Sequence, residues 1–100
     1  MKTTITENGD NITVSLSGDL DTVAAQQTEK EFQPLLSVKD KTITVDCKEL
    51  NYISSSGLRL FLSLLKSCNP NRNSLVLENV NDNIKKVFTM TGFSALFNIK

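Results

Sequence analysis

Residues 43–62, ITVDCKELNYISSSGLRLFL, join two sequence patterns that decide the fold. The run Thr42–Cys47 alternates polar with apolar residues, which predicts a strand. From Leu58 onward, apolar residues fill most of a helical wheel and leave one narrow polar arc, which predicts a helix. Residues 48–54 are expected to turn between the two, and three consecutive serines, 54–56, stand where the helix begins. A strand followed directly by a helix is typical of α/β folds.

The N-terminal part of the chain has the pattern of a β-hairpin. Residues 8–10, NGD, separate two alternating runs, and Asn-Gly between β-prone segments favours a tight turn. In the second run Ile12, Val14 and Leu16 share one face, as expected for a half-buried pair of antiparallel strands.

Further strands and helices are expected to alternate along the rest of the chain. Pro34 must kink or end the first helix, because proline lacks an amide proton and clashes with the preceding turn. The remaining expected elements are strands over residues 74–80 and 96–100, and helix caps at Asp21 or Thr22 and at Asn81 or Asp82.

The resulting order, β-β-α-β-α-β-α-β, predicts an α/β fold in a single domain over residues 1–100. We expect a small mixed sheet of four to five strands, with its first strand antiparallel at one edge and its helices packed mainly on one face. Leu60 and Leu64 lie outside the arc of their helix that one sheet face can cover. We expect them to contact a neighbouring helix, with a partner protein as the alternative.

The composition argues against several classes of function. Eleven Lys and Arg balance eleven Asp and Glu, so there is no basic excess for nucleic acid and no charge to attract anionic lipid. With no histidine and no CxxC pair, no metal site is expected, and Cys47 and Cys68 are interpreted as buried, reduced thiols. The chain shows neither a signal-peptide pattern nor an apolar run near the roughly 20 residues that cross a bilayer. We therefore expect a cytoplasmic protein with no membrane segment.

The three serines have several alternative roles. A serine nucleophile needs a base, usually histidine, and the chain has neither a histidine nor a GxSxG motif, so we expect no enzymatic activity. Serine is a good helix N-cap, because its oxygen accepts an amide hydrogen of the first turn, but capping explains only one of the three. A need for small residues at a close packing contact could explain the other two.

Phosphorylation is a more specific alternative. A phosphate at a helix N-terminus meets free amide donors and the positive end of the helix dipole, so the helix can carry it. It would add about −1.5 to −2 charges to the surface and repel a partner docked there.

Three motifs in order resemble the STAS family, named for sulphate transporters and anti-sigma-factor antagonists. LSGDLD, residues 16–21, looks like the family's G-x-L-D after its second strand, and residues 43–62 are similar to its strand and D-S-S-G-L segment. NIKKVFTMTGFSALFNI, residues 83–99, looks like its closing segment, so the resemblance covers nearly the whole chain. It implies the same α/β fold that the element order predicts.

The resemblance also implies site residues. In the family's antagonists the serine after the aspartate of D-S-S-G is phosphorylated, and alignment on Gly57 places that serine at Ser55. The family aspartate falls on Ser54, with Ser54 and Ser56 as less favoured acceptors. Asp46 and Asp21 match two acidic family positions and are expected near the turn that holds Ser54–Ser56, called the serine turn below. The alternative roles are a strand-end turn for Asp46 and a helix cap for Asp21. The expected partner-contact residues are Asp21, Ser54, Ser55, Ser56, Gly57, Leu58 and Arg59.

The resemblance finally implies a mechanism, partner switching in transcription regulation. The unphosphorylated protein, a monomer without a cofactor, would bind an anti-sigma factor that is also a serine kinase and so release the sigma factor. The kinase would phosphorylate the serine with its own ATP and dissociate, and a metal-dependent serine phosphatase would reset the protein. The alternative is a STAS-like binding subunit of a transport or signalling complex that is not phosphorylated.

Overall fold

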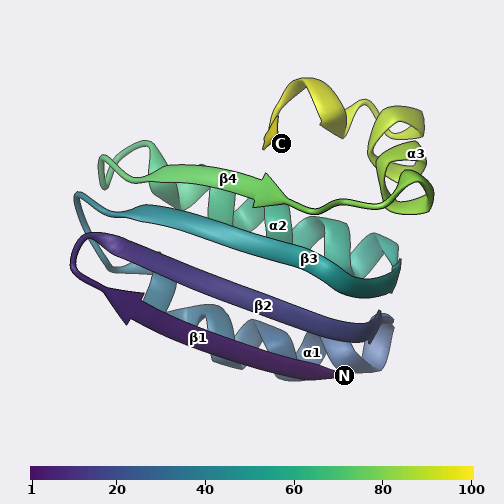
Figure 1. Ribbon diagram of the computed structural model, residues 1–100, viewed down its shortest axis with the longest axis horizontal. Helices are drawn as coiled ribbons and strands as arrows, with labels where there is room; N and C mark the ends of the chain where they lie inside the picture. The colour runs from purple at the N-terminus through teal and green to yellow at the C-terminus, as the bar shows by residue number, and fades with distance from the viewer.

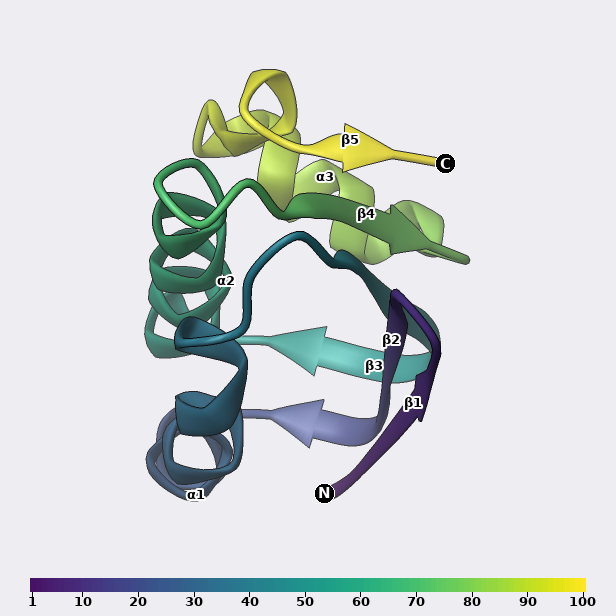
Figure 2. The ribbon, with the colours of Figure 1, turned by 90° about the vertical axis from the view of Figure 1, so that its left-hand side faces the viewer.

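The computed structural model describes residues 1–100 and has one five-stranded sheet in the order β1-β2-β3-β4-β5 (Figure 1 and Figure 2). β1 is antiparallel to β2, and all other neighbouring strands are parallel, which confirms the predicted mixed sheet with an antiparallel edge. The strands are β1 Lys2–Asn8, β2 Asn11–Leu20, β3 Thr42–Ile53, β4 Ser74–Glu78 and β5 Asn98–Ile99.

The helices lie mainly on one face of this sheet, as predicted. Figure 2 shows α1 and α2 side by side against it, while the opposite face carries no helix. The side chain of Asn81 caps α3 and also donates from Nδ2 to the Leu50 carbonyl at 3.0 Å, which ties α3 to β3. The helices are α1 Thr22–Phe32, α2 Ser55–Cys68 and α3 Asp82–Met90, with 3₁₀ turns η1 Gln33–Leu36 and η2 Phe93–Ala95.

Two local predictions are confirmed at the residues that generated them. The hairpin closes through Gly9 and Asp10, where Gly9 has a φ of +61°, a region that glycine adopts without strain. α1 ends at Phe32 and the chain tightens into η1, which contains Pro34, so proline ends the α-helix there.

The expected turn over residues 48–54 is wrong, because β3 continues to Ile53. Two register shifts against β2 break the regular alternation, so Lys48 and Glu49 are both exposed while Leu50 and Ile53 are buried. Irregular pairing of this kind hides the period-two signal of a strand. The extended β3 carries the serine turn to the far end of the sheet.

The core joins the sheet to all three helices. Phe61 of α2, Phe88 of α3 and Phe97 before β5 meet edge to face, with ring centroids 5.4 to 6.5 Å apart.

Cys47 and Cys68 are buried and unpaired, as predicted, and burial together with nearby Asp46 raises the pKa of Cys47 to about 12.

Truncation of Phe88 should lower stability strongly, because its fully buried ring contacts both other rings. We expect Phe88→Ala to reduce the free energy of unfolding by about 3–5 kcal/mol in urea titration. The matched control is Met90→Ala on the same helix, where the side chain is 85% exposed and the expected change is below about 0.5 kcal/mol. Equal losses in the two variants would contradict this account of the core.

Candidate functional site

The candidate site lies where β2 and β3 end together. Leu20 and Ile53 are paired in register, and the Ser54 amide donates to the Leu20 carbonyl at 2.8 Å. Each strand passes directly into a helix cap: Asp21 Oδ1 accepts from the Ala24 amide at 2.8 Å, and Ser54 Oγ accepts from the Gly57 amide at 3.2 Å. The carboxyl ends of neighbouring parallel strands thus place two helix N-termini side by side.

The three serines have three different environments. Ser54 is only 9% exposed and caps α2, so it is the serine that capping explains. Ser56 is half-buried, and its Oγ accepts from Arg59 Nη2 at 3.4 Å. Ser55 is exposed at the first position of α2, and its hydroxyl makes no hydrogen bond within the protein. Of the three, Ser55 has the hydroxyl most accessible to another protein.

Gly57 allows the first turn of α2 to lie against the strand ends. A Cβ at this position would lie 2.8 Å from Ile53 Cγ1 and 2.8 Å from Leu20 Cγ, closer than side chains approach. Leu58, the next residue, is 5% exposed and belongs to the core. Gly57 and Leu58, both predicted as partner contacts, are therefore buried and hold the serine turn in place.

The structure separates the two acidic residues that were expected near the serines. Asp21 is exposed and caps the adjacent helix, so the prediction and its alternative cap role both hold for it. Asp46 lies within β3 and pairs with Ser15, while Ile53 before the serines pairs with Leu20. Ser15 and Leu20 are five residues apart on β2, roughly 17 Å at about 3.3 Å per residue. The Asp46 Oδ1 accepts from the Lys48 amide and from Asn79 Nδ2, each at 3.0 Å. The expectation that Asp46 lies near the serines is wrong, because β3 is longer than predicted.

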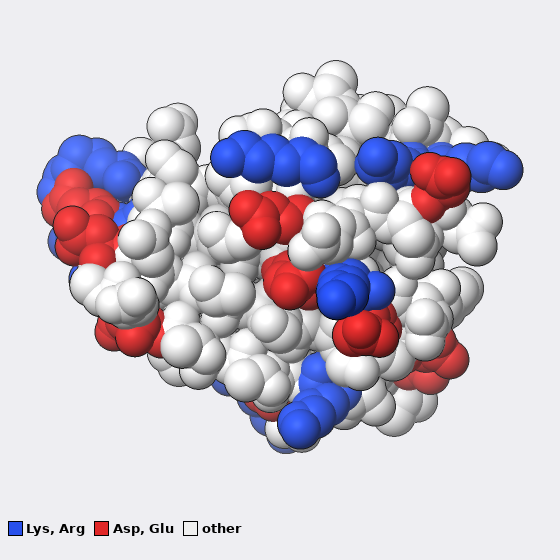
Figure 3. Space-filling view, viewed as in Figure 1, with Lys and Arg blue, Asp and Glu red and all other residues white.

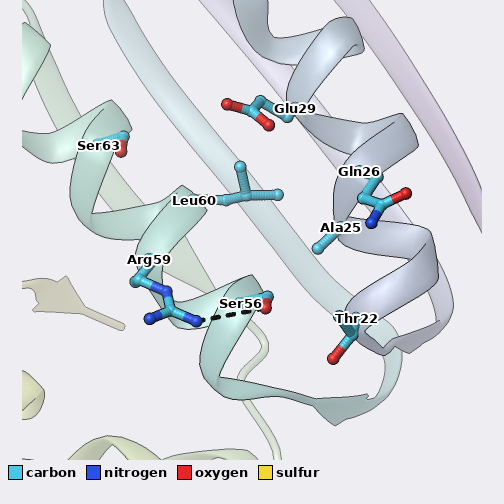
Figure 4. Close-up of a pocket in the computed structure, with 8 residues that line it drawn as sticks. All are labelled: Thr22, Ala25, Gln26, Glu29, Ser56, Arg59, Leu60 and Ser63. Carbon is cyan, nitrogen blue, oxygen red and sulfur yellow. Dashed lines mark hydrogen bonds between the residues drawn. The ribbon is translucent and has the colours of Figure 1, made fainter.

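A shallow groove of about 300 Å³ runs between α1 and α2 from the serine turn. Figure 4 shows Ser56 and Leu60 on α2 directed toward α1, which carries Thr22, while the Arg59 side chain lies over α2 and points toward Ser56. Leu60 is half-buried against the core and lines the groove beside α1, as expected for contact with a neighbouring helix. Leu64 is fully buried in the core.

Two exposed apolar residues flank the site and were missed in the sequence. Val23 in the first turn of α1 is 76% exposed, and Tyr52, next to Ile53 in β3, is 52% exposed. Apolar residues in a strand or helix are ordinarily interpreted as core. Val23 and Tyr52 are uncovered because each lies near the end of its element, where few neighbours pack against it.

Charged groups are mixed over the surface. Figure 3 shows acidic and basic side chains interspersed on the helix-free face of the sheet. The ion pairs are Lys41–Asp10 at 3.8 Å and Arg72–Asp40 at 2.7 Å, and the hydrogen bond from Arg72 holds the pKa of Asp40 below its usual value. None of the helices combines the length and apolar character needed to cross a membrane.

The chain is similar to proteins of one family. A family model described as STAS domain matches residues 2–100. An anti-sigma-B factor antagonist of Staphylococcus aureus is 30% identical over 86 residues, which are 86% of this chain and 80% of that protein. These two matches establish the family.

Solved structures share the fold at lower identity. An anti-sigma factor antagonist from Mycobacterium paratuberculosis superposes with a TM-score of 0.87 at 16% identity, covering 98% of this chain and 83% of that one. The phosphorylated form of the Bacillus cell fate determinant SpoIIAA superposes with a TM-score of 0.75 at 20% identity, covering 99% and 91%.

Gly57→Ala should destabilise the protein, although alanine is normally the better helix former by about 1 kcal/mol. The added methyl group must displace Ile53 and Leu20, which we expect to cost about 1–3 kcal/mol in the free energy of unfolding. Ser56→Ala, one position earlier, is the control and should change stability little. A Gly57→Ala variant as stable as the parent in urea titration would refute this packing role.

Proposed function

The chain belongs to the STAS domain family, and from this we propose that it is an anti-sigma-factor antagonist that works by partner switching. It binds an anti-sigma factor that is also a serine kinase, and phosphorylation of Ser55 by that kinase ends the binding. The observation that carries this proposal is the exposed Ser55 hydroxyl, free of hydrogen bonds, at the first position of a helix whose cap is supplied by Ser54.

Ser55 can accept a phosphate without loss of the fold. The hydroxyl takes no part in the cap, because Ser54 supplies it, and the side chain points into solvent. A phosphate here lies near the first-turn amides, which have no partners within the helix, and near the positive end of the helix dipole. Ser54 and Ser56 are less suitable acceptors, because Ser54 is buried in the cap and Ser56 is half-buried.

The partner would contact the edge where the two helices begin. Asp21, Ser55 and Arg59 are exposed there and Ser56 is half-buried, while Ser54, Gly57 and Leu58 support the turn from below. Val23 and Tyr52, each two residues from one of the two helix caps, add exposed apolar side chains near this edge. Aromatic residues with polar neighbours are typical of protein interfaces.

A phosphate on Ser55 would change this edge electrostatically. It brings about −1.5 to −2 charges to the edge that also carries Asp21, on a chain whose formal net charge is zero. A partner surface that complements the neutral serine then faces unpaired negative charge, and like-charge contacts of this kind cost several kcal/mol.

The proposal also covers the state of the protein and the enzymes that add and remove the phosphate. Residues 1–100 act as one monomeric domain in the cytoplasm, with no cofactor and no catalytic activity of their own. The likeness to the family supports the last two steps, in which the kinase supplies the phosphate and a metal-dependent serine phosphatase removes it.

Incubation with the cognate kinase and ATP should place one phosphate on the protein. We expect mass spectrometry to map it to Ser55, and Ser55→Ala to abolish it. The Ser37→Ala variant, which changes an exposed serine after η1, should be phosphorylated like the parent. No phosphate on residues 54–56 would contradict the switch and favour the alternative, a binding subunit that is not phosphorylated.

Charge and bulk at Ser55 should control kinase binding. We expect Ser55→Ala to bind as the parent does and Ser55→Asp to bind at least about tenfold more weakly in calorimetry. Ser37→Asp adds the same charge just after η1, beyond the C-terminal end of α1, and should leave the affinity unchanged. Unaltered affinity of Ser55→Asp would show that this serine lies outside the interface.

A further inference from the structure

We propose that Arg59 is the counter-ion of phosphorylated Ser55. Its guanidinium pairs with the phosphate from within the same chain, one helical turn after the serine. The inference rests on the proposed function for the presence of the phosphate. It adds the residue whose side chain pairs with the phosphate, and a second change that phosphorylation makes at the partner surface.

The spacing along α2 brings Arg59 to the phosphate. Arg59 is four residues after Ser55 and three after Ser56, and residues at these separations are neighbours on a helix surface. Long helical side chains also lean back toward the N-terminus of their helix. Figure 4 shows the Arg59 side chain directed back toward Ser56, where Nη2 donates to Oγ at 3.4 Å. The guanidinium therefore already lies over the first turn.

Arg59 is free to take a new partner. The two ion pairs of the protein involve other residues, so no carboxylate lies within 4.0 Å of its guanidinium. Among the residues that line the groove it is the only cation, and Glu29 on α1 is the only acid. Its one side-chain hydrogen bond goes to a neutral hydroxyl and is long. A phosphate oxygen is a much stronger acceptor, because it carries charge.

The chemistry of the two groups matches. A phosphoserine presents three acceptor oxygens, and the planar guanidinium donates two parallel hydrogen bonds to such a group. The carboxylate of Asp21, which caps α1 on the same edge, acts in the opposite sense. Arg59 is therefore the group in this neighbourhood that stabilises the doubly charged phosphate.

This pairing gives phosphorylation two effects on the partner surface. In the unphosphorylated protein the guanidinium is exposed and available to the partner. After phosphorylation it turns to the phosphate, so the surface gains negative charge and loses a donor at the same time. The switch then depends on the position of Arg59 as well as on the added charge.

The test measures the second pKa of phosphoserine, about 6 when unperturbed, by phosphorus NMR titration. Phosphoserine is built into position 55 of the full chain during translation, so no kinase is needed. A nearby cation favours the doubly charged form and lowers this pKa. We expect Arg59→Gln to raise it by about 0.2–0.7 of a pH unit, the range for an exposed ion pair, and Arg59→Lys to restore part of the difference.

Lys66→Gln is the matched control, because it removes an exposed cation two turns further along the same helix. It should leave the phosphate pKa as in the parent, and high salt should shrink the effect of Arg59→Gln. An unchanged pKa in Arg59→Gln, or an equal rise in Lys66→Gln, would overturn the role of Arg59. Failure of the kinase to phosphorylate Ser55 would count against the proposed function alone, since the installed phosphate makes this measurement independent of it.

Discussion

The close approach of α2 to the ends of β2 and β3 is the constraint on which the site depends. The Ser54 amide donates to the Leu20 carbonyl, and Gly57 has no side chain where Leu20 and Ile53 already fill the space. This contact directs the first turn of α2 and fixes the direction in which the next serine points. A bulkier residue at position 57 would move the helix start away from the sheet.

Structural and chemical roles are divided among three adjacent serines. Ser54 satisfies an amide of the first turn from a buried position, and Ser56 accepts from Arg59. Ser55 has no such task in the fold, because its hydroxyl is exposed and makes no hydrogen bond within the protein. The division follows from helix geometry, because successive residues of a first turn point in directions about 100° apart.

The same edge gathers features from separate parts of the chain. Asp21 follows β2, the serines follow β3, and the Arg59 side chain points back from the second turn of α2. Parallel strands bring these segments together, because their carboxyl ends lie at one edge of the sheet. An edge built in this way requires no pocket, since its chemistry lies on exposed side chains.

Much of this protein could be predicted from local sequence, because local signals act over a few residues. The hairpin at residues 8–10, the end of α1 before Pro34 and the order of the elements follow from turn chemistry and hydrophobic period. The three motifs indicated the family, and the position of Ser55 followed from alignment on Gly57. Only the tertiary structure decided how far β3 extends, because register shifts against β2 conceal its alternation. The length of β3 places Asp46 far from the serines. The tertiary structure alone also decided that Val23 and Tyr52 are uncovered and that Arg59 lies over the first turn of α2 without a carboxylate partner. These properties depend on what lies beside a residue in space, which the pattern along the chain does not contain.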